Sequence, residues 1–303
     1  MQQLDLTTII LTFNEEIHIR RCLDNICEIS KQVFVVDSYS TDKTCDIARE
    51  YENVTVLQNA WVNYATQFNW ALQNCPVATK WILRLDADEY LTDELKAELR
   101  ERLDMLPEEY TAIVLPRRRV FMGRTIRRGG TGNIRLLRIF QNGKAKCEVR
   151  QMDEHIQLLE GKTIDFKGEF ADDNLNNISL WTQKHVGYAI REAVDLLDIE
   201  FGLYENAEEK EGNKLSDEAK QKRALKYSYS RKPLFWRSFL YFCYRYFFRL
   251  GFLEGKEGFM WHFFQGWWYR SLVDAKVWEV KKACGNDKEK MKEYLTREYR
   301  IRF

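Results

Sequence analysis

The sequence predicts an α/β fold in which helices flank a mostly parallel sheet, followed by a helical extension. Short apolar runs rich in β-branched residues alternate with segments whose apolar residues recur at helical spacing. This alternation requires crossover connections and therefore parallel strands. The density of Phe, Tyr and Trp after residue 233 indicates an amphipathic aromatic extension. We expect one domain over residues 1–175 and the extension over residues 176–303.

The strands and helices are expected in a regular order. Residues 6–11 predict a first strand, and the segment after it has a helical apolar face made of Ile19, Cys22, Leu23 and Ile26. Residues 33–36 predict a second strand, after which Asp42 is suited to cap a helix with the face Thr44, Ile47, Ala48 and Tyr51. A third strand, a third helix and a fourth strand are predicted at residues 54–57, 64–72 and 81–85.

Composition excludes several classes of protein. With 303 residues and 45% hydrophobic content, the chain can bury a substantial core and is not a disordered tail. A formal net charge of +1 provides no basic field, so we expect no nucleic-acid partner. Seven scattered cysteines without metal-binding spacing indicate reduced, cytosolic residues, and the N-terminus lacks the features of a signal peptide.

Polar side chains follow three of the predicted strands at the point where each strand ends. Thr12 and Asn14 follow the first strand, Asp37 follows the second, and Asp86 and Asp88 follow the fourth. Because ligands bind beyond the carboxyl ends of parallel strands, we expect these side chains to converge. The sequence therefore predicts a ligand site at this edge of the sheet.

The acids after the fourth strand are the most informative feature. In an extended chain, Asp86 and Asp88 point to one side and Ala87 to the other, so two carboxylates can bind one divalent cation, which can hold a diphosphate. Asp37 is suited to accept a hydrogen bond from a base N–H or a ribose hydroxyl. A structural alternative stays open for both segments, because acids after a strand also cap the following helix.

Four motifs occur in order along the chain: Thr12-Phe13-Asn14-Glu15, Val36-Asp37-Ser38 with Asp42, Gln67-Phe68-Asn69-Trp70-Ala71, and Leu85-Asp86-Ala87-Asp88-Glu89. Together they resemble the family 2 glycosyltransferases, which have a GT-A, Rossmann-like fold, over roughly residues 5–160. The resemblance implies transfer of a sugar from a nucleotide-sugar donor, with a UDP-sugar as the first expectation and inversion at the anomeric carbon.

The resemblance also assigns residues to the donor. It implies that Thr12, Asn14 and Glu15 line the nucleotide pocket and that Asp37, with Ser38, holds the base. Asp86, Ala87 and Asp88 would bind the donor diphosphate, with Mg²⁺ or Mn²⁺ held by the two aspartates. Gln67 stands where many relatives carry an arginine, so this donor contact would lack a positive charge here.

A second acidic segment is expected to supply the catalytic base. An inverting displacement needs a carboxylate that takes the proton of the acceptor hydroxyl. The resemblance places this acid in Met152-Asp153-Glu154-His155, and we favour Glu154, with Asp153 as the second candidate. His155 is a candidate metal ligand, or alternatively a hydrogen-bonded wall residue.

Residues 117–150 carry eleven Lys or Arg and one acid. We expect them to form strands and loops with cationic side chains at the mouth of the site. Arginine forks suit phosphate oxygens, so these side chains are suited to the donor diphosphate or a pyrophosphate on the acceptor. A solvated basic surface is the alternative.

The C-terminal third begins with a predicted helix over residues 180–201, whose apolar face contains Val186, Ile190, Val194 and Leu197. A polar interval over residues 205–222 is expected to be a connector.

Residues 233–253 are dense in apolar and aromatic side chains, but Arg237, Arg245 and Arg249 make a bilayer span costly. A helix lying at the membrane surface would instead extend these arginines to lipid phosphates. Residues 217–249 hold nine Lys or Arg against two acids, which favours an anionic leaflet. We therefore expect peripheral binding at the cytoplasmic face of the inner membrane. An aromatic helix pair packed on the catalytic domain, or on a second subunit in a homo-oligomer, is the alternative.

The tail also resembles bacterial enzymes that build capsule, exopolysaccharide or lipopolysaccharide core, through Lys184-His185, Pro233-Leu234-Phe235-Trp236 and the segment 251–259. This resemblance implies a lipid-linked saccharide acceptor.

Two alternatives to a metal-dependent hexosyltransferase stay open. A nucleotidyltransferase is disfavoured because no glycine-rich phosphate loop follows the first strand, and a non-catalytic scaffold that binds nucleotide sugars would lack turnover.

Overall fold

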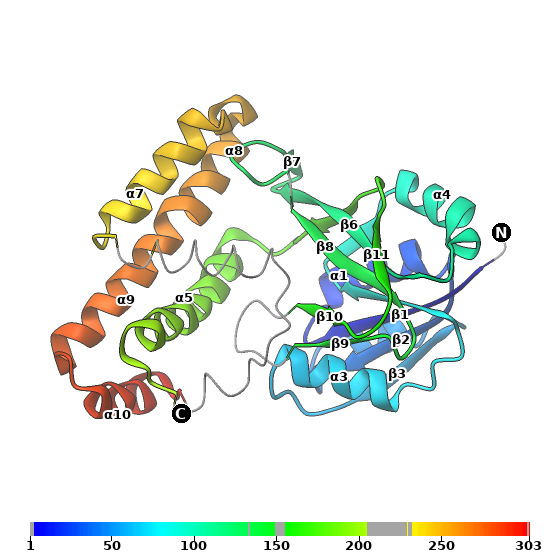
Figure 1. Cartoon of the computed structure of the whole chain (residues 1–303), viewed down its shortest axis with the longest axis horizontal. Helices are drawn as coiled ribbons and strands as arrows, with labels where there is room; N and C mark the ends of the chain where they lie inside the picture. Colours follow the sequence, from blue (N-terminus) through cyan, green and yellow to red (C-terminus); the bar gives the residue numbers. More distant parts are fainter. Residues whose placement is uncertain (1–2, 133, 149–154, 205–228, 230–231, 302) are drawn as a thin grey trace. The chain divides into compact units, whose positions relative to one another are not determined.

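The computed structural model describes residues 3–132, 134–148, 155–204, 229, 232–301 and 303. The chain divides into two compact units, Met1–Asn176 and Asn177–Phe303. Figure 1 shows a sheet with helices in the first unit and a set of helices in the second. The predicted connector at residues 205–222 lies outside the described residues.

The elements of the first unit begin with the predicted alternation of strands and helices: β1 (Leu4–Thr12), α1 (Glu16–Ile26), β2 (Ser30–Asp37), α2 (Thr44–Ala48), β3 (Val54–Gln58), α3 (Tyr64–Asn74) and β4 (Trp81–Asp86). The later elements are β5 (Glu89–Leu91), α4 (Asp93–Arg102), η1 (Leu103–Met105), β6 (Tyr110–Phe121), β7 (Arg124–Ile126), β8 (Arg135–Gln141), β9 (Ala145–Cys147), β10 (Ile156–Leu158), β11 (Lys162–Asp165) and β12 (Phe170–Asp173).

One large sheet runs through the first unit in the order β3-β2-β1-β4-β8-β6-β12-β5, with β7 and β11 also paired to β6. The strands β3, β2, β1 and β4 are mutually parallel, whereas β8 is antiparallel to β4 and to β6. Strands β9 and β10 form a separate antiparallel pair. This mixed sheet flanked by helices confirms the predicted α/β, GT-A fold.

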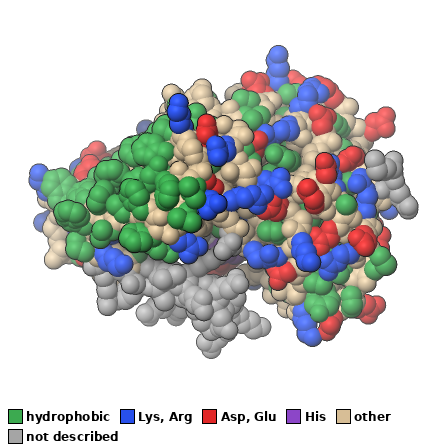
Figure 2. Space-filling view, turned by 90° about the horizontal axis from the view of Figure 1, so that it is seen from above, with side chains coloured by type: hydrophobic (Ala, Val, Ile, Leu, Met, Phe, Trp, Pro, Cys, Tyr) green, Lys and Arg blue, Asp and Glu red, His purple; other side chains and the backbone are tan. Residues whose placement is uncertain are grey.

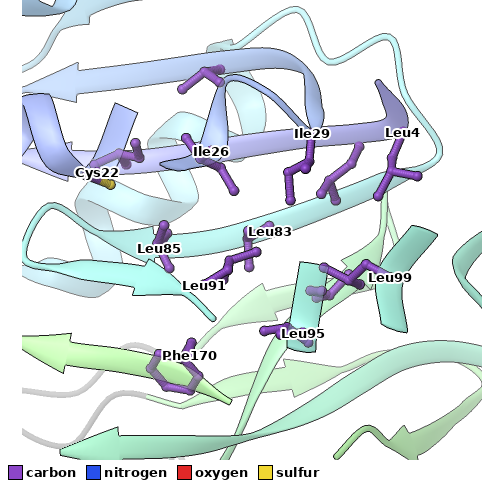
Figure 3. Packing of buried hydrophobic residues seen from close by; sticks show 14 of the residues in the cluster. Leu4, Cys22, Ile26, Ile29, Leu83, Leu85, Leu91, Leu95, Leu99 and Phe170 are labelled. Atoms are coloured by element: carbon purple, nitrogen blue, oxygen red, sulfur yellow. The ribbon is translucent and has the colours of Figure 1, made fainter. Parts of the chain in front are cut away.

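Both faces of the parallel strands are apolar, which follows from the alternation of side chains along each strand. Ile10 and Leu83 face one core with the buried residues of α1 and α4, whereas Ile9 and Ile82 face a second core with α3. Figure 3 shows the first core, where side chains of α1, α4, β4 and β12 meet. The predicted face of α1 is confirmed, because its four apolar residues are fully buried.

The second predicted helix is shorter than expected. It ends at Ala48, and Tyr51 lies in the turn beyond it, because β3 begins at Val54 with its N–H bonded to the Tyr51 carbonyl (3.2 Å). The Tyr51 hydroxyl instead donates to Asp24 of α1 at 2.7 Å. Asp42 accepts hydrogen bonds from the N–H groups of Thr44 (3.0 Å) and Glu16 (3.1 Å), so it serves the starts of both helices.

The second unit is helical, with its core between the long helices α5 and α9. The helix α5 begins after Asn177, whose side chain accepts from the Leu180 N–H, and ends at Gly202 with a φ of 63°. Ile190, Val194 and Leu197 are buried as predicted, but Val186 is 43% exposed. The elements are α5 (Ile178–Phe201), α7 (Trp236–Cys243), η2 (Tyr244–Phe248), η3 (Gly251–Glu254), α8 (Gly255–Trp261), η4 (His262–Trp268), α9 (Tyr269–Cys284) and α10 (Lys288–Tyr299).

The arginines of the aromatic segment do not lie where the sequence suggested. Arg237 and Arg245 are buried, and Arg237 pairs with the equally buried Asp274 of α9 through its Nε at 2.7 Å. These two side chains therefore point into the helical unit rather than toward lipid phosphates, because a buried carboxylate offers Arg237 a fixed partner. Arg249 alone of the three is exposed. Among the described residues, no helix combines the length and apolar character needed to cross a membrane.

The helix α1 provides a matched test of the first core. Ile19 is fully buried and Ile17 is 50% exposed in the same helix. We expect Ile19→Ala to lower the free energy of unfolding by about 2–5 kcal/mol, whereas Ile17→Ala should lower it by less than about 1 kcal/mol. Urea denaturation followed by circular dichroism measures both. Equal losses for the two variants would contradict the assignment of Ile19 to the core.

Candidate active site

The carboxyl ends of β1, β2 and β4 meet at one edge of the sheet. The parallel register places Thr12 beside Asp37 and Leu11 beside Asp86. The Thr12 hydroxyl donates to Asp37 Oδ1 at 3.0 Å, and the Ser38 N–H donates to the Thr12 carbonyl at 2.9 Å. The structure therefore brings together the polar residues that the sequence placed at the ends of these strands.

Asp37 is fully buried, and both of its carboxylate oxygens accept hydrogen bonds from other residues of the protein. Oδ1 accepts from Thr12 and from the Ser40 hydroxyl, and Oδ2 accepts from the Ser40 N–H (2.8 Å) and from Gln58 Nε2 (3.3 Å). Burial would raise the pKa of Asp37, but the hydrogen bonds from Ser40, Cys45 and Thr12 outweigh it and lower the pKa. In this conformation Asp37 organises the turn after β2, and contact with a base requires one of these donors to be exchanged. Its role in binding a base stays a prediction.

The loop after β1 is fixed by contacts with the loop after β2. Asn14 has a φ of 55°, and its side-chain oxygen accepts from the Thr41 N–H at 2.8 Å. Glu15 bonds the ring of the buried His18, with 2.6 Å between Oε2 and Nδ1. Since His18 Nε2 accepts from the Leu175 N–H at 2.9 Å, Nδ1 carries the proton and donates to Glu15. Asn14 itself is exposed at the edge of the sheet.

Gln67 and Ser38 belong to a buried polar network. Gln67 Nε2 donates to the Ser38 hydroxyl (3.2 Å) and to the Asn59 carbonyl (3.1 Å), and Gln67 Oε1 accepts from Asn59 Nδ2 (2.8 Å). Asn69 bonds both the N–H and the carbonyl of Cys147 at 2.8 Å, which ties α3 to β9. These amides serve as structural links here, and the donor contact assigned to Gln67 stays a prediction.

The acids after β4 lie in a turn, so the predicted extended geometry is wrong. The strand ends at Asp86, and Ala87 and Asp88 turn into β5. Glu89 stabilises the turn because its Oε2 accepts the Asp86 N–H at 2.9 Å. The Ala87 side chain packs in the first core, and the residue is 3% exposed, so its side chain is not available to a sugar donor.

Asp86 is positioned by aromatic and cationic neighbours. Asp86 Oδ1 accepts the Tyr64 hydroxyl at 2.6 Å, and that hydroxyl accepts Arg84 Nε at 2.7 Å. Arg84 also lies over the Tyr64 ring, 4.1 Å from its centroid. Burial raises the pKa of Tyr64 well above its usual value, so the hydroxyl remains a donor toward Asp86. This chain of contacts fixes one carboxylate oxygen of Asp86.

Behind the turn, Glu89 and Arg138 form a buried ion pair. Arg138 Nη2 lies 2.6 Å from Glu89 Oε1 and 3.8 Å from Asp86 Oδ2, and both Glu89 and Arg138 are less than one-tenth exposed. Burial raises the pKa of Glu89, and the Arg138 charge opposes that rise. Both Glu89 oxygens accept hydrogen bonds, a role that suits the ionised form. The pair therefore fixes the start of the acidic turn.

Asp88 is surrounded by other acids. Burial and the negative charges of Asp172, Asp86 and Glu15 raise the pKa of Asp88 to about 6, although a hydrogen bond from Asn174 Nδ2 (2.9 Å) opposes this rise. Asp172 and Asn174 were not among the site residues predicted from the sequence. The available signal was a second pair of acids, Asp172 and Asp173, at the end of a strand pattern.

The donor chemistry of these residues fits a divalent cation. Carboxylate oxygens are the ligands that Mg²⁺ and Mn²⁺ prefer, and the mutual repulsion that raises the pKa of Asp88 is what a bound cation would relieve. Among the described residues, no group of three His, Cys, Asp or Glu side chains has an arrangement that could hold a metal ion. His155 lies just before β10, and its carbonyl accepts the Glu148 N–H at 2.9 Å. Asp153 and Glu154 lie outside the described residues.

The basic segment forms the strands β6, β7 and β8, as predicted, but much of its charge is paired. Arg118 bonds Glu169 at 2.6 Å, and Arg135 bonds Asp165 at 2.7 Å. Arg117 and Arg119, on one side of β6, both approach Asp172, at 3.7 and 2.6 Å. Burial and the neighbouring Arg119 charge lower the pKa of Arg117 to about 10. Arg117 and Arg119 thus lie near Asp172 and the acidic turn. The charges of other arginines in the segment are neutralised by Glu169 and Asp165.

The Glu89–Arg138 pair can be tested by unfolding. We expect Glu89→Gln to lower the free energy of unfolding by about 3–5 kcal/mol, because Arg138 would remain buried without its nearest anion. Replacing both residues, as Glu89→Leu with Arg138→Met, should cost less than the single change, since no uncompensated charge is left. Glu109→Gln, at an exposed ion pair with Lys162, is the control and should change little. A double variant less stable than Glu89→Gln would contradict the pairing.

Comparison with known proteins finds glycosyltransferases that are similar to part of this chain. An uncharacterised glycosyltransferase of Rickettsia typhi is 37% identical over 94 residues, which is 31% of each chain. The lipopolysaccharide core biosynthesis glycosyltransferase LpsC of Rhizobium meliloti is 28% identical over 153 residues, covering 49% of this chain and 55% of LpsC. The matched region thus spans about a third of the rickettsial protein and about half of LpsC.

The structure of S. aureus TarS residues 1–349 in complex with UDP-GlcNAc is 15% identical, and the match covers 98% of this chain and 92% of that TarS chain, with a TM-score of 0.44. At that score the likeness adds nothing to the assignment. The sequence model of the family described as glycosyl transferase family 2 matches residues 7–157, which contain most of β1, the strands β2 to β4 and the acidic turn. The chain belongs to glycosyl transferase family 2.

Proposed function

We propose that this protein is an inverting glycosyltransferase that moves a sugar from a nucleotide-sugar donor to a hydroxyl group of a saccharide acceptor. The observation that carries the proposal is the acidic turn at the end of β4, which places Asp86 and Asp88 next to the carboxyl ends of β1 and β2. Burial and the charges of nearby carboxylates raise the pKa of Asp88 to about 6. Such repulsion is costly in an empty site and useful in one that binds a cation with a diphosphate.

The donor we propose first is a UDP-sugar. The loops after β1 and β2 would hold the nucleoside, with Asn14 exposed at the edge and Asp37 fixing the turn behind it. Asp86 and Asp88 would hold Mg²⁺ or Mn²⁺ beside the diphosphate. When bound, such a cation neutralises charge that develops on the departing nucleotide. Arg117 and Arg119 pair with Asp172 and would add positive charge near the proposed diphosphate site.

The transfer itself requires one proton acceptor from the chain. The acceptor oxygen forms a bond to the anomeric carbon while the bond from that carbon to the diphosphate oxygen breaks, and the hydroxyl proton passes to a carboxylate. We assign this role to Glu154, with Asp153 as the second candidate. The nucleoside diphosphate leaves with the bonding electron pair.

We propose a lipid-linked saccharide as the acceptor, in the synthesis of a bacterial cell-surface polysaccharide at the cytoplasmic face of the inner membrane. The similarity to LpsC, whose name assigns it to lipopolysaccharide core biosynthesis, supports this choice. A hexose is the proposed transferred sugar. The membrane location follows from the acceptor, because a lipid-linked substrate is held at the bilayer surface.

The proposal predicts that Asp88→Asn releases nucleotide from the sugar donor more slowly than the wild type does. We expect Mn²⁺-dependent nucleotide release to fall by about a hundredfold or more, because one anionic ligand is removed from the diphosphate site. Asp93→Asn is the matched control, since Asp93 is 98% exposed in α4. The assay screens UDP-, GDP- and dTDP-sugars, with circular dichroism as the check on folding. Normal turnover in Asp88→Asn would refute the metal site, and an absence of turnover in the wild type with every donor would favour a binding scaffold.

The catalytic base has a separate test. Glu154→Gln should lower transfer about 10²- to 10⁴-fold while leaving UDP binding intact, because proton removal is lost but the donor site is not changed. Asp153→Asn is measured in parallel, and Glu109→Gln serves as a distant control. If both acidic variants transfer sugar normally and bind UDP normally, the base lies elsewhere in the chain.

A further inference from the structure

We propose that the exposed side of residues 235–259, here called the aromatic face, docks on the surface of an anionic phospholipid bilayer. The face consists of α7, η2, η3 and α8. Figure 2 shows apolar side chains gathered over a wide area of the helical unit, with Lys and Arg at its margins. The inference deepens the membrane location proposed above, because it names the surface that meets the lipid.

The exposed side chains on this face are large and apolar. Trp236 is 65% exposed, Leu240 is 59% exposed and Phe248 is 78% exposed. Phe247 and Leu253 are also at least half exposed, and Tyr244 is nearly so. Single apolar side chains on a surface are ordinary, but a continuous group of this size marks a site of interaction.

The polarity of the helix α7 is reversed relative to a helix that faces water. Its buried side carries Arg237 and Ser238 beside the buried Phe242, and its exposed side carries Trp236 and Leu240. Arg237 is satisfied by the buried Asp274, and the Ser238 hydroxyl lies 2.9 Å from that of Ser271. Polar groups thus bond one another inside, while apolar groups face outward. This is the arrangement expected where the outer medium is lipid.

The reversed polarity continues into the following elements. Arg245, Glu254 and His262 are all less than one-tenth exposed. Burial, followed by the Arg245 charge, lowers the pKa of His262 to about 3, so this ring stays neutral. These three side chains are therefore withdrawn from the face, whose exposed surface is formed largely by aromatic and aliphatic side chains.

The charges that remain exposed favour an anionic partner. Lys232, Arg249 and Lys256 are exposed, whereas the acids within residues 232–259 are the buried Glu254 and the partly exposed Glu257. In a two-fold dimer through this face, two surfaces with the same excess of exposed cations would meet, which is unfavourable. Anionic headgroups would instead neutralise them, and Trp and Tyr side chains are suited to the same layer.

The face is expected to lie on the bilayer rather than cross it. Among the described helices none is suited to spanning a membrane. A helix with one apolar side and basic flanks lies in the plane of the headgroups. The buried Arg237–Asp274 pair is compatible with this position, since it faces the rest of the helical unit and not the lipid.

Vesicle flotation of the full-length protein tests the proposal. The vesicles contain equal amounts of phosphatidylcholine and phosphatidylglycerol, and a second set contains phosphatidylcholine alone. We expect the wild type to float with the anionic vesicles. The triple variant Trp236→Ser, Leu240→Ser and Phe248→Ser should bind these vesicles at least about tenfold more weakly. The matched control replaces Met105, Met122 and Leu159, three exposed apolar residues of the first unit, by Ser and should float as the wild type does.

A charge variant separates the electrostatic contribution to membrane binding from the apolar contribution. Arg249→Glu with Lys256→Glu should weaken binding to the anionic vesicles and lower its salt dependence, because headgroup attraction is lost. Nucleotide release with a donor sugar is measured on the same preparations, and the triple variant should retain it. Loss of flotation with intact release therefore concerns this face alone, whereas failure of glycosyl transfer leaves the flotation result unaffected.

Two outcomes would overturn the proposal. One is a wild type that remains at the bottom with anionic vesicles, or a triple variant that floats equally well. The other is a lipid-free dimer, seen by light scattering, that the triple variant converts to monomer without any vesicle binding by the wild type, because a second copy would then be the occupant of the face.

Discussion

The parallel pairing of β1 with β2 and β4 is the constraint on which the rest of the site depends. It places Thr12 beside Asp37 and Leu11 beside Asp86, so that loops distant in sequence begin at one edge of the sheet. The two apolar cores hold this register, because a shift by one residue would exchange the faces of Ile9 and Ile10. Site geometry is thus inherited from core packing.

The main strands, the helix α1 and the edge where the polar residues meet could be predicted from the sequence, because they follow from alternation and from topology. The turn at Ala87 could not, since the Glu89 side chain that accepts the Asp86 N–H is itself held by Arg138, which is distant in sequence. Asp172 and Asn174 reach Asp88 from β12 and the residues after it, and no local pattern indicates that approach.

The aromatic segment shows the same limit of sequence patterns. Its composition predicts an interface with lipid or protein, but composition does not tell which side of a helix is buried. The partner of Arg237 lies on α9, so the inward direction of this arginine follows only from the packed structure. The second unit thus has an exposed apolar surface over a buried ion pair. Binding of this surface to a bilayer would bring the proposed transferase to a lipid-linked acceptor.

The most direct test of the central claim is a crystal structure with UDP and Mn²⁺, with manganese located by its anomalous scattering. We predict a manganese peak in contact with a carboxylate of Asp88 or Asp86 and with an oxygen of the UDP diphosphate, and uridine beside the loops that contain Asn14 and Asp37. Manganese and UDP bound away from the end of β4, or UDP bound there without manganese at either aspartate, would contradict this account.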